Sequence, residues 1–596
     1  MKATRSRICD KPELIKLYEQ PRDKLILAYD TEDDSKGMTY MVNIFDGLNH
    51  YTFRHTETAV EYILALSDQY KKGIEIWSAN QLYDIGNTFR VNQDTLSFVL
   101  AGSRFITGKI YKEKIKFKDI LNVIPGASVK KLGKMIGFEK LETDDFNNEF
   151  YCQTDTEIVY WSLLQYKKTL LDLGVVLKNT AAGTGFSALL KEYKQLTYNS
   201  FKFEDHLFLK QGYYGGRTEI FNTAKQKGDV YCYDIVSSYP HAMTQIPICN
   251  TYTRYYTKKP DFRLEGMCEC IIEAPDDITM PYLPVRIEDK LSFPIGIFHG
   301  TWTYFEIRES LKLGYKIKKV IKALEFPINY NFTLKDFVMK FFNVKSKAEA
   351  EKNMVLREAA KTILNASYGK FALSNERSDL VALNEIDNIK PPFSSIIYPN
   401  NQIMVTRSGD FAPSTNFLIA SLITAYGRHA LYEKLILCSS ENRIPLYCDT
   451  DSVFYKGEKL AHEKSPKLGS FNLQYECIEA HFILPKTYYI KFSDNTKIYK
   501  CKGVRDKLAE LFFTKGFAES MQPLKYVETC RKNYYIAERN KKKKDKKITV
   551  ESLLPFNLWV NKPKKLNAKY NKRIKLKHGA TKPIKLNFDL ETNTYI

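Results

Sequence analysis

The sequence predicts a multidomain α+β protein, on three observations. At 596 residues the chain has room for two to five domains and ample buried core. Before roughly residue 180, short strand patterns such as 25–29 and 74–77 alternate with helical patterns, which indicates an α/β domain. Further along, strand patterns end in acidic residues, and a helical pattern of apolar residues runs through 357–369.

Composition and charge exclude several classes of protein. With 44% hydrophobic and 13% aromatic residues the chain is not disordered, and no apolar run approaches the ~18 residues of a membrane-spanning helix. The basic N-terminus lacks the hydrophobic core of a secretory signal, and the scattered cysteines favour a reduced intracellular protein without a zinc cluster. A net charge of +21 suits a polyanion, nucleic acid more than membrane, although charge alone is equally compatible with an unrelated basic protein.

Gly/Pro-containing segments at 125–126, 183–185 and 390–393 mark loops or insert boundaries. The densest basic segments, 541–547 and 562–578, have apolar and aromatic residues between them. That mixture predicts a folded basic module rather than a charged tail.

The stretch Y-C-D-T-D-S-V-F-Y, 447–455, places two acids inside a run of strand formers, where Asp is depleted. Side chains in a strand alternate between faces, so Asp449 and Asp451 are expected side by side on one face. Carboxylates that close repel each other and lose hydration unless a positive group lies between them. The stretch therefore predicts a bound cation.

Two further segments supply partners for this pair. In G-D-V-Y-C-Y-D-I-V-S-S-Y-P, 228–240, a strand delivers Asp234 to a turn, where a helix cap is the alternative interpretation. The helix predicted at 357–369 has polar side chains on one face, with an ordinary solvated face as the alternative. These side chains are Arg357, Lys361, Asn365 and Tyr368. Carboxylates from two strands facing a cationic helix are what phosphoryl transfer by two metal ions requires, and Mg²⁺ is the expected ion.

These segments resemble the motifs of family B DNA polymerases in order and spacing. D-I-V-S-S-Y-P resembles motif A, K-T-I-L-N-A-S-Y-G motif B and Y-C-D-T-D-S motif C. The resemblance implies a right-handed polymerase of palm, fingers and thumb. It implies metal binding at Asp234, Ile235 and Asp451, with Asp449 as a supporting catalytic carboxylate.

The same resemblance implies a nucleotide site formed by Ile235, Tyr239, Arg357, Lys361, Asn365 and Tyr368. In it Lys361 holds the phosphates, Asn365 and Tyr368 line the nascent base pair, and Tyr239 excludes a 2′-hydroxyl. L-P-K-T-Y-Y-I-K, 484–491, resembles the K-x-Y motif and places Lys486 and Tyr488 near the primer terminus. K-C-K-G, 500–503, lies where such chains pass from palm to thumb.

Three upstream segments resemble a DnaQ-like 3′–5′ exonuclease of RNase H-like fold. They are L-A-Y-D-T-E (27–32), N-Q-L-Y-D (80–84) and Y-C-Q-T-D (151–155). The resemblance implies that Asp30, Glu32, Asp84 and Asp155 hold two more metal ions. Tyr151 would orient the attacking water, and Asn80 and Tyr83 would bind the DNA strand.

The sequence departs from the exonuclease pattern at two places. Asp33 and Asp34 stand where the family usually has Thr, and Ile120-Leu121 lacks the hydroxyl of the family's Ser/Thr-Leu pair. The family's catalytic lysine corresponds to Lys140. We still expect an active exonuclease.

Y-Y-G-G-R, 213–217, resembles the Y-x-G-G motif that links the two domains, with a tight turn as the alternative. It implies DNA binding by Tyr213, Gly215, Gly216 and Arg217. Two intervals that flank motif B resemble, by position and size, the terminal protein regions of protein-primed polymerases from phages and linear plasmids. The implied divisions are 1–180 (exonuclease), 181–249 (palm), 250–340 (first insert), 341–373 (fingers), 374–414 (second insert), 415–500 (palm) and 501–596 (thumb and basic segment).

The sequence thus predicts a protein-primed, strand-displacing DNA polymerase with a proofreading exonuclease, replicating a small linear genome. Each site is expected to hold two Mg²⁺, with Mn²⁺ as a substitute. Expected partners are primer–template DNA, dNTPs and a terminal protein, which would contact Lys258, Lys259, Arg263 and Arg286. We expect a monomer without a membrane anchor in the host cytoplasm. The alternatives are a self-priming replicase and a nuclease whose polymerase half only binds DNA; a non-catalytic binding protein would leave seven carboxylates idle.

Overall fold

A computed structural model provides the arrangement of the chain. It describes residues 3–5, 24–33, 39–89, 96–101, 104–110, 114–141, 149–197, 200–329, 332–383, 386, 393–398, 402–461, 467–502, 506–515, 517–523, 559–565 and 570–595. Asp34, the basic run at 541–547, Phe556 and Leu558 lie outside these ranges. Within them, no helix combines the length and the apolar character needed to cross a membrane.

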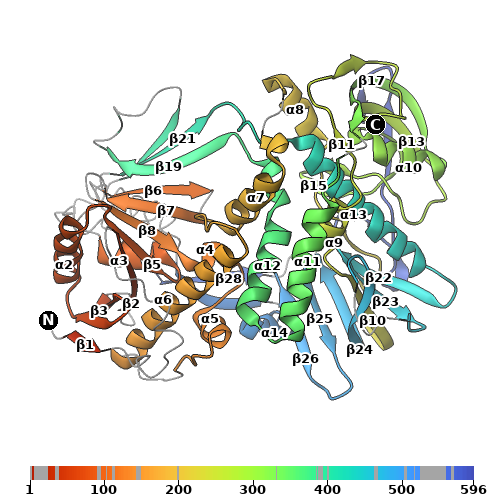
Figure 1. Cartoon of the computed structure of the whole chain (residues 1–596). Coiled ribbons are helices and arrows are strands. Elements are labelled where there is room, and N and C mark those ends of the chain that lie inside the picture. The colour runs from red at the N-terminus through yellow and green to blue at the C-terminus, as the bar shows by residue number, and fades with distance from the viewer. Residues whose placement is uncertain are drawn as a thin grey trace, which may run out of the picture.

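The N-terminal part is built on one large sheet, drawn in red and orange in Figure 1. Its strands are β1 (Ala3–Arg5), β2 (Leu25–Asp33), β3 (Thr39–Phe45), β4 (Asn49–Phe53), β5 (Ile74–Ser78), β6 (Leu96–Ala101), β7 (Arg104–Ile110) and β8 (Ile115–Asp119). The wholly buried β5 lies at the centre, parallel to both β2 and β8. The helices are α2 (Thr56–Gln69), α3 (Gln81–Thr88), α4 (Ile120–Val123), α5 (Val129–Met135) and α6 (Glu149–Asp172). The predicted α/β domain is confirmed.

A second, seven-stranded sheet carries the C-terminal acidic motifs. Its order is β26-β25-β24-β10-β23-β22-β9. The strands are β9 (Thr218–Ile220), β10 (Gln226–Ile235), β22 (Arg443–Asp449), β23 (Ser452–Gly457), β24 (Phe471–Leu484), β25 (Thr487–Lys491) and β26 (Lys497–Cys501). The long apolar helix α13 (Phe417–Leu437) and the short α9 (Ser238–Met243) contact each other beside it. Strands β10 and β23 are central because their apolar residues are buried on both faces.

Two paired helices stand between the sheets, shown in green in Figure 1. They are α11 (Lys335–Ala350) and α12 (Met354–Ala366), joined by a turn in which the Asn353 side chain caps α12 by accepting the Leu356 N–H. The helix predicted at 357–369 therefore begins earlier and ends at Ala366, after which η4 (Tyr368–Ala372) forms a tighter turn. Helix α7 (Ala181–Glu192) packs on α12.

The interval 250–340 forms its own sheet, in the order β12-β17-β13-β16-β31-β32. The strands are β12 (Tyr255–Thr257), β13 (Glu265–Ala274), β16 (Ile295–Thr303), β17 (Lys316–Phe326), β31 (Lys585–Asp589) and β32 (Thr594–Tyr595). Helix α10 (Tyr304–Lys312) follows β16 behind a capping box of Thr303 and Glu306. The last two strands come from the far end of the sequence, and β31 pairs in parallel with β16.

Smaller elements complete the described chain. They are η3 (Lys194–Thr197), α8 (Phe203–Gln211), β11 (Ile248–Cys249), β14 (Val285–Ile287), β15 (Lys290–Ser292), β18 (Ile328–Asn329), α14 (Asp506–Lys515), β27 (Phe517–Pro523), β28 (Trp559–Lys565), β29 (Ile574–Lys575), η7 (Lys577–Gly579) and β30 (Thr581–Lys582).

The interval 374–414 contributes strands to the sheet of the N-terminal domain. Its strands β19 (Glu376–Ala382), β20 (Ser394–Tyr398) and β21 (Gln402–Ser408) extend the N-terminal sheet, because β19 pairs with β6. Leu380 of β19 is fully buried in the core of the N-terminal domain, with Phe98 among its neighbours in that cluster. The interval is thus anchored to the first domain by backbone pairing and by an apolar side chain.

Leu380→Ala should loosen this anchor. Removing the buried side chain should cost about 2–5 kcal/mol at the β6–β19 junction, since a cavity remains. Hydrogen exchange of the β19 and β21 amides should accelerate, and urea unfolding of the N-terminal domain should shift to lower concentration. Val381→Ala, at the half-buried neighbouring position, is the matched control and should change little. Equal exchange in Leu380→Ala and wild type would show that the junction does not depend on this side chain.

Candidate active sites

The acids of 447–455 lie on a hairpin turn, not along one strand. β22 ends at Asp449 and β23 begins at Ser452, and these two residues pair. Thr450 between the acids has φ +64°, and the Asp451 N–H donates to the Asp449 carbonyl at 2.6 Å. The prediction of two neighbours on one strand face is therefore wrong. The turn sends Asp451 toward β10, whose Asp234 lies opposite Ser452.

The positive group beside Asp449 is a lysine of the protein. Lys486 Nζ lies 2.8 and 2.9 Å from the two carboxylate oxygens, and the Tyr447 hydroxyl donates to Oδ2 at 3.0 Å. Lys486 belongs to the predicted K-x-Y motif and occupies the turn between β24 and β25. Asp449 is thereby neutralised within the protein, which agrees with a supporting role rather than a metal ligand.

Asp234 and Asp451 lack such a partner. Within the described part of the chain, no other side chain donates a hydrogen bond or ion pair to either. Burial raises the pKa of Asp234 to about 7, and the charge of Asp451 adds to the effect. Burial also raises the pKa of Asp451 to about 6, with Asp449 contributing and Lys486 opposing. Two converging, half-buried carboxylates fit a divalent cation, because oxygen anions are its preferred ligands.

Helices α11 and α12 carry cations, and one of them lies beside motif A. Arg357 and Lys361 lie on the partly exposed face of α12, as predicted, and Asn365 is exposed one turn further. Lys345 of α11 joins them, with Nζ 3.4 Å from the Ser237 hydroxyl next to motif A. Burial lowers the pKa of Lys345, and Arg357 and Lys361 lower it further. The sequence analysis missed Lys345, because only the folding of α11 against α12 brings it here.

Tyr239 and Tyr368 form the floor of the predicted nucleotide site. Their ring centroids are 4.9 Å apart. Gly427 of α13 leaves room for this arrangement, since a Cβ there would lie 3.2 Å from the Tyr239 ring. The two predicted residues therefore act as one aromatic surface supported by α13.

The loop 213–217 supports the acidic hairpin. A Cβ on Gly216 would lie 2.8 Å from the Thr450 side chain, so only glycine fits against the turn. Gly215 faces open space, which suits the predicted approach of a DNA strand. Arg428 of α13 holds the loop by donating to the Tyr214 and Gly215 carbonyls at 2.7 and 2.9 Å.

Arg217 is buried in the protein, not at the surface where a DNA contact would require it. Its side chain is 1% exposed, and it forms an ion pair with Glu219 at 2.5 Å. Its guanidinium also donates to the Pro281 carbonyl and packs 4.1 Å from the Phe293 ring centre. A group so enclosed has no surface to offer a phosphate, which favours a structural role over the predicted DNA contact.

The four acids of the N-terminal domain converge from three elements. Asp30 and Glu32 lie on β2, Asp84 on α3 and Asp155 on α6. Burial raises the pKa of Asp30 well above its ordinary value, and Asp84, Asp155 and Glu32 raise it further. Burial likewise raises the pKa of Glu32 to about 7. Cys152, which sequence reasoning missed, lies one turn before Asp155, with Sγ 3.8 Å from Asp30 Oδ2.

This donor set fits divalent cations. The buried Oδ1 of Asp155 has no hydrogen-bond partner among the described residues, so one oxygen remains for a ligand. Ser78 and Thr31 donate to Asp84 at 2.6 and 2.8 Å and fix its orientation. Ligand atoms of Asp30, Glu32 and Cys152 lie within 4.8 Å of one another.

Lys140 and Tyr151 complete the first site. Lys140 forms an ion pair with Asp155, and its Nζ lies 4.2 Å from the centre of the Tyr151 ring. Burial is the largest single effect on the pKa of Lys140, and it lowers that pKa. The contacts with Asp155 and Tyr151 together outweigh burial, so the pKa is raised. The lysine predicted from the family pattern therefore lies at the acidic cluster.

The departures from the family pattern have structural consequences. Asp33 accepts hydrogen bonds from Thr39 at 2.7 Å and from the Tyr83 hydroxyl at 2.5 Å, so the extra acid holds a predicted DNA-binding residue. Asn80 begins α3 in the left-handed conformation. Asp119, also missed, accepts the backbone N–H groups of Gln81 and Leu121 at 3.1 and 2.8 Å. It joins α3 to the start of α4, where the family pattern has its hydroxyl.

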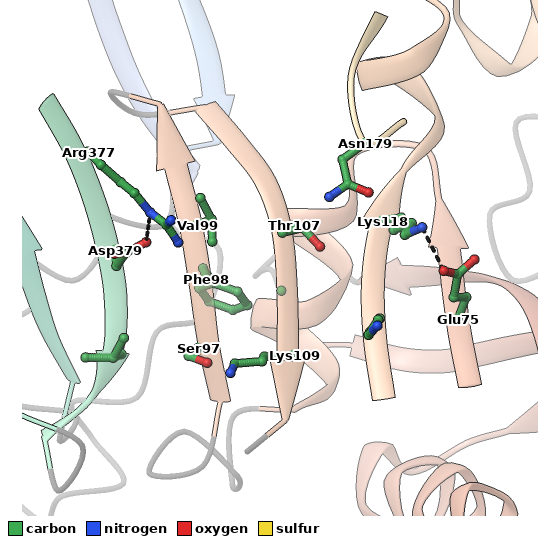
Figure 2. A pocket seen from close by; sticks show the side chains of 13 residues that line it. Glu75, Ser97, Phe98, Val99, Thr107, Lys109, Lys118, Asn179, Arg377 and Asp379 are labelled. Carbon is green, nitrogen blue, oxygen red and sulfur yellow. Dashed lines mark hydrogen bonds and ion pairs between the residues drawn. The ribbon is translucent and has the colours of Figure 1, made fainter. Parts of the chain in front are cut away.

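A basic groove of about 390 Å³ lies where the sheet of the first domain meets β19 (Figure 2). Its cations include Lys118, which pairs with Glu75, and Arg377, which pairs with Asp379. Lys109 and Lys116 lie directly opposite each other on β7 and β8 and are exposed. Neither has an ion-pair partner in the described ranges, and like charges placed so are unfavourable without an anion nearby.

The raised pKa of Asp234 predicts that ionisation of this carboxyl lowers the stability of the metal-free protein in a pH-dependent way. Its folded pKa of about 7 exceeds the ordinary 3.8, so the folded protein binds the proton more tightly, and stability falls as pH rises through that interval. Asp234→Asn removes this cost. In EDTA at pH 8 it should raise the free energy of unfolding by roughly 1–3 kcal/mol, allowing for partial exposure.

The difference in the free energy of unfolding between Asp234→Asn and wild type should shrink at pH 5. Urea unfolding at pH 8 and pH 5 measures it. Asp229→Asn, at an exposed position of the same strand, is the control and should show no such pH dependence. A stability gain for Asp234→Asn that is independent of pH would contradict the assignment.

Comparison with known proteins agrees with the family resemblance of the sequence motifs. Residues 128–395 match the family model "DNA polymerase type B, organellar and viral". The DNA-directed DNA polymerase of Enterobacteria phage PRD1 is 26% identical over 298 residues, 49% of this chain and 51% of that protein. A probable DNA polymerase of Podospora anserina is 23% identical over 368 residues, 53% of this chain and 30% of that protein. The chain thus spans about half or less of these curated relatives.

Solved structures show the same fold. Phi29 DNA polymerase complexed with primer-template DNA has a TM-score of 0.69 at 16% identity, covering 91% of this chain and 100% of that one. Its ternary complex with incoming nucleotide substrates has a TM-score of 0.66 at 17% identity, covering 85% and 97%. The predicted fold, an RNase H-like domain followed by palm, fingers and thumb, is confirmed. In its motifs, fold and matched relatives, the chain is similar to the family B DNA polymerases of the organellar and viral type.

Proposed function

We propose that the chain is a DNA-directed DNA polymerase with a 3′–5′ exonuclease, primed by a protein and able to displace a strand. The observation that carries the proposal is the placement of Asp234 and Asp451, two carboxylates without a side-chain partner among the described residues, near the turn where Lys345 of α11 meets Ser237. The relatives named DNA polymerase support it.

In the polymerase site, the chain's own residues would position both reactants. Arg357, Lys361 and Lys345 would hold the triphosphate as its charge spreads during transfer to the primer 3′-hydroxyl. Lys486 would balance the negative charge of Asp449 and lie near the primer end. Two Mg²⁺, or Mn²⁺ in their place, bound by Asp234 and Asp451 would supply activation of the hydroxyl and stabilisation of the leaving pyrophosphate.

Sugar selection would fall to the aromatic floor. Tyr239, backed by α13 at Gly427 and in contact with Tyr368, would pack beneath C2′ and leave no room for a hydroxyl. The exposed Asn365 would line the base pair.

In the first domain, Asp30, Glu32, Asp84 and Asp155 would hold two Mg²⁺ for hydrolysis at a 3′ end. Tyr151, beside Lys140, would orient the attacking water, and the lysine would balance the carboxylate charge. Asn80 and Tyr83 would hold the terminal nucleotides, with Tyr83 fixed by Asp33. Exonuclease activity would remove misincorporated nucleotides.

Priming by a protein would use the sheet of 250–340. Lys258 and Lys259 are exposed, and Arg263, although paired with Asp261, is almost wholly exposed, so these three suit contact with an acidic partner. Arg286 instead donates to the carbonyls of Gln211 and Tyr213 and supports the 213–217 loop. The interval 374–414 and the groove with Lys109 and Lys116 would hold template DNA and help separate the downstream duplex.

The two activities should separate by mutation. Asp234→Asn or Asp451→Asn should reduce primer extension roughly 100-fold or more, because each removes a metal ligand worth several kcal/mol without changing size. Degradation of single-stranded DNA from the 3′ end should persist. The converse variant, Asp30→Ala with Glu32→Ala, should lose degradation and keep extension.

Each variant is the folding control for the other, since the sites share no ligand. Extension at the wild-type rate by Asp234→Asn would refute the polymerase assignment. Loss of both activities in Asp30→Ala with Glu32→Ala would indicate that the first site is structural.

Protein priming makes a separate prediction. Incubation with a small acidic-faced protein from the same genetic element, Mg²⁺ and labelled dATP should give a covalent protein–nucleotide adduct through a Ser, Thr or Tyr hydroxyl. Charge reversal at Lys258 and Lys259 should reduce adduct formation about tenfold and leave extension of a DNA primer unchanged. Robust synthesis on unprimed template without any partner would favour self-priming instead.

A further inference from the structure

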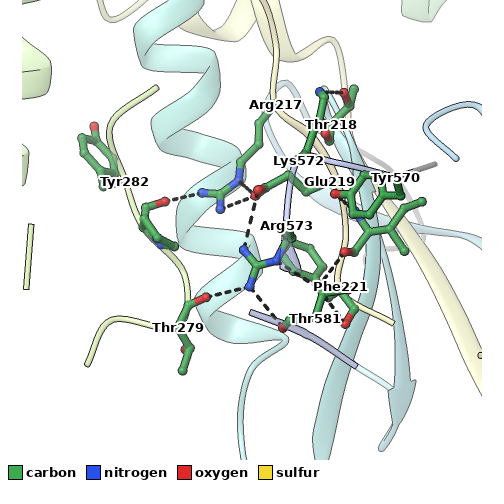
Figure 3. A network of polar contacts seen from close by, with 12 residues as sticks. Arg217, Thr218, Glu219, Phe221, Thr279, Tyr282, Tyr570, Lys572, Arg573 and Thr581 are labelled. Carbon is green, nitrogen blue, oxygen red and sulfur yellow. Dashed lines mark hydrogen bonds and ion pairs between the residues drawn. The ribbon is translucent and has the colours of Figure 1, made fainter. Parts of the chain in front are cut away.

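The segment 570–582 lies against the edge strand of the palm, although it is remote from it in sequence (Figure 3). The Tyr570 hydroxyl accepts the Ile220 N–H at 2.9 Å, and the Thr581 N–H donates to the Phe221 carbonyl at 2.9 Å. The Gly579 carbonyl accepts the Thr223 N–H at 2.7 Å. The segment therefore satisfies backbone groups in the last residue of β9 and directly after it.

Behind this contact, one buried carboxylate lies between two buried arginines. Glu219 is 0% exposed, Arg217 1% and Arg573 3%. Arg573 Nη1 lies 3.6 Å from Glu219 Oε1, and its Nη2 donates to the Thr279 carbonyl at 3.1 Å. Figure 3 shows both guanidinium groups pointing at the carboxylate. A buried ion cluster seldom adds stability over apolar packing, so it is better explained by the geometry that it imposes.

Two series of contacts connect this segment and its ion cluster to the acidic hairpin. The carbonyl of Arg217 accepts the N–H of Thr450, the residue between Asp449 and Asp451, at 2.7 Å. Separately, Lys572 Nζ donates to the carbonyl and the hydroxyl of Thr218, each at 3.0 Å. Thr218 is the cross-strand partner of Asp449. Lys572 thus lies one residue removed from the turn, through Thr218, and Arg573 lies two residues removed, through Glu219 and Arg217.

We propose that Lys572 and Arg573 are positioning residues of the polymerase site, acting through Thr218 and through Glu219 and Arg217 to fix the turn that carries Asp449 and Asp451. The inference rests on the proposed polymerase function. It assigns the segment 570–582 to the scaffold of the palm, rather than to the thumb side to which the sequence assigned it.

The test compares four single substitutions in the full chain. Arg573→Met and Lys572→Met remove the cations, Arg573→Lys retains the charge, and Lys585→Ala is the control. Lys585 belongs to the same C-terminal segment but pairs at the surface with Asp276, with no route to the turn. Because residues that orient metal ligands typically affect metal affinity or activity 10–100-fold, the Met variants should lose roughly that factor in primer-extension kcat.

Further measurements distinguish positioning from general stability. The Mg²⁺ concentration for half-maximal extension should rise several-fold in the Met variants, while KM for dNTP and exonuclease activity on single-stranded DNA stay at wild-type values. Arg573→Lys should recover most of the lost extension. In the Asp30→Ala, Glu32→Ala background, Mn²⁺ binding followed by electron paramagnetic resonance should weaken by a similar factor.

The outcomes are decisive in either direction. Extension and Mn²⁺ binding equal to those of Lys585→Ala would overturn the inference, and so would parallel loss of extension and exonuclease activity with a lowered melting temperature. If the wild-type chain fails to extend a primer, the polymerase proposal falls. Mn²⁺ binding by Arg573→Met and Lys585→Ala then still decides whether the segment positions the turn.

Discussion

Buried like charge is the constraint around which both sites are organised. Burial, and then repulsion from a neighbouring carboxylate, raises the pKa values of Asp234 and Asp451. The protein neutralises only selected members of each cluster. Lys486 pairs with Asp449 in the palm, and Lys140 pairs with Asp155 in the first domain. In the palm, Asp234 and Asp451 are left without a cation and are the carboxylates proposed to hold metal ions, whereas Asp155 keeps one oxygen, Oδ1, without a hydrogen-bond partner among the described residues.

Selective pairing also explains the shape of the surrounding scaffold. Asp451 can turn away from Asp449 only because Thr450 adopts a left-handed conformation, and that turn is held by the Arg217 carbonyl and by the space left at Gly216. Arg428 in turn holds the 213–217 loop from α13. A loop identified in the sequence as a DNA contact is therefore also the support of the acidic hairpin.

The sequence predicted the fold class, the order of the motifs and the acidic residues of both sites, because these depend on local pattern and on motif spacing. It failed where the outcome depends on distant contacts. The turn at 449–451 was hidden because strand formers flank it on both sides and no glycine marks it. The burial of Arg217 depends on Glu219 and on residues of the far C-terminal segment, and the place of Lys345 depends on the pairing of α11 with α12. None of these contacts leaves a periodic signal.

The pairing of β6 with β19 has a consequence for how the chain folds. The two strands are neighbours in the sheet, yet the whole chain from Ala101 to Glu376 runs between them. Loop closure over such a separation is slow, so the N-terminal sheet must wait for β19 while the rest of the chain folds. During that interval β6 is an open edge, with Leu380 absent from the core, and open edges invite pairing with other chains. Concentration and temperature during refolding should therefore govern the yield of active protein through aggregation at this edge, before either acidic site is assembled.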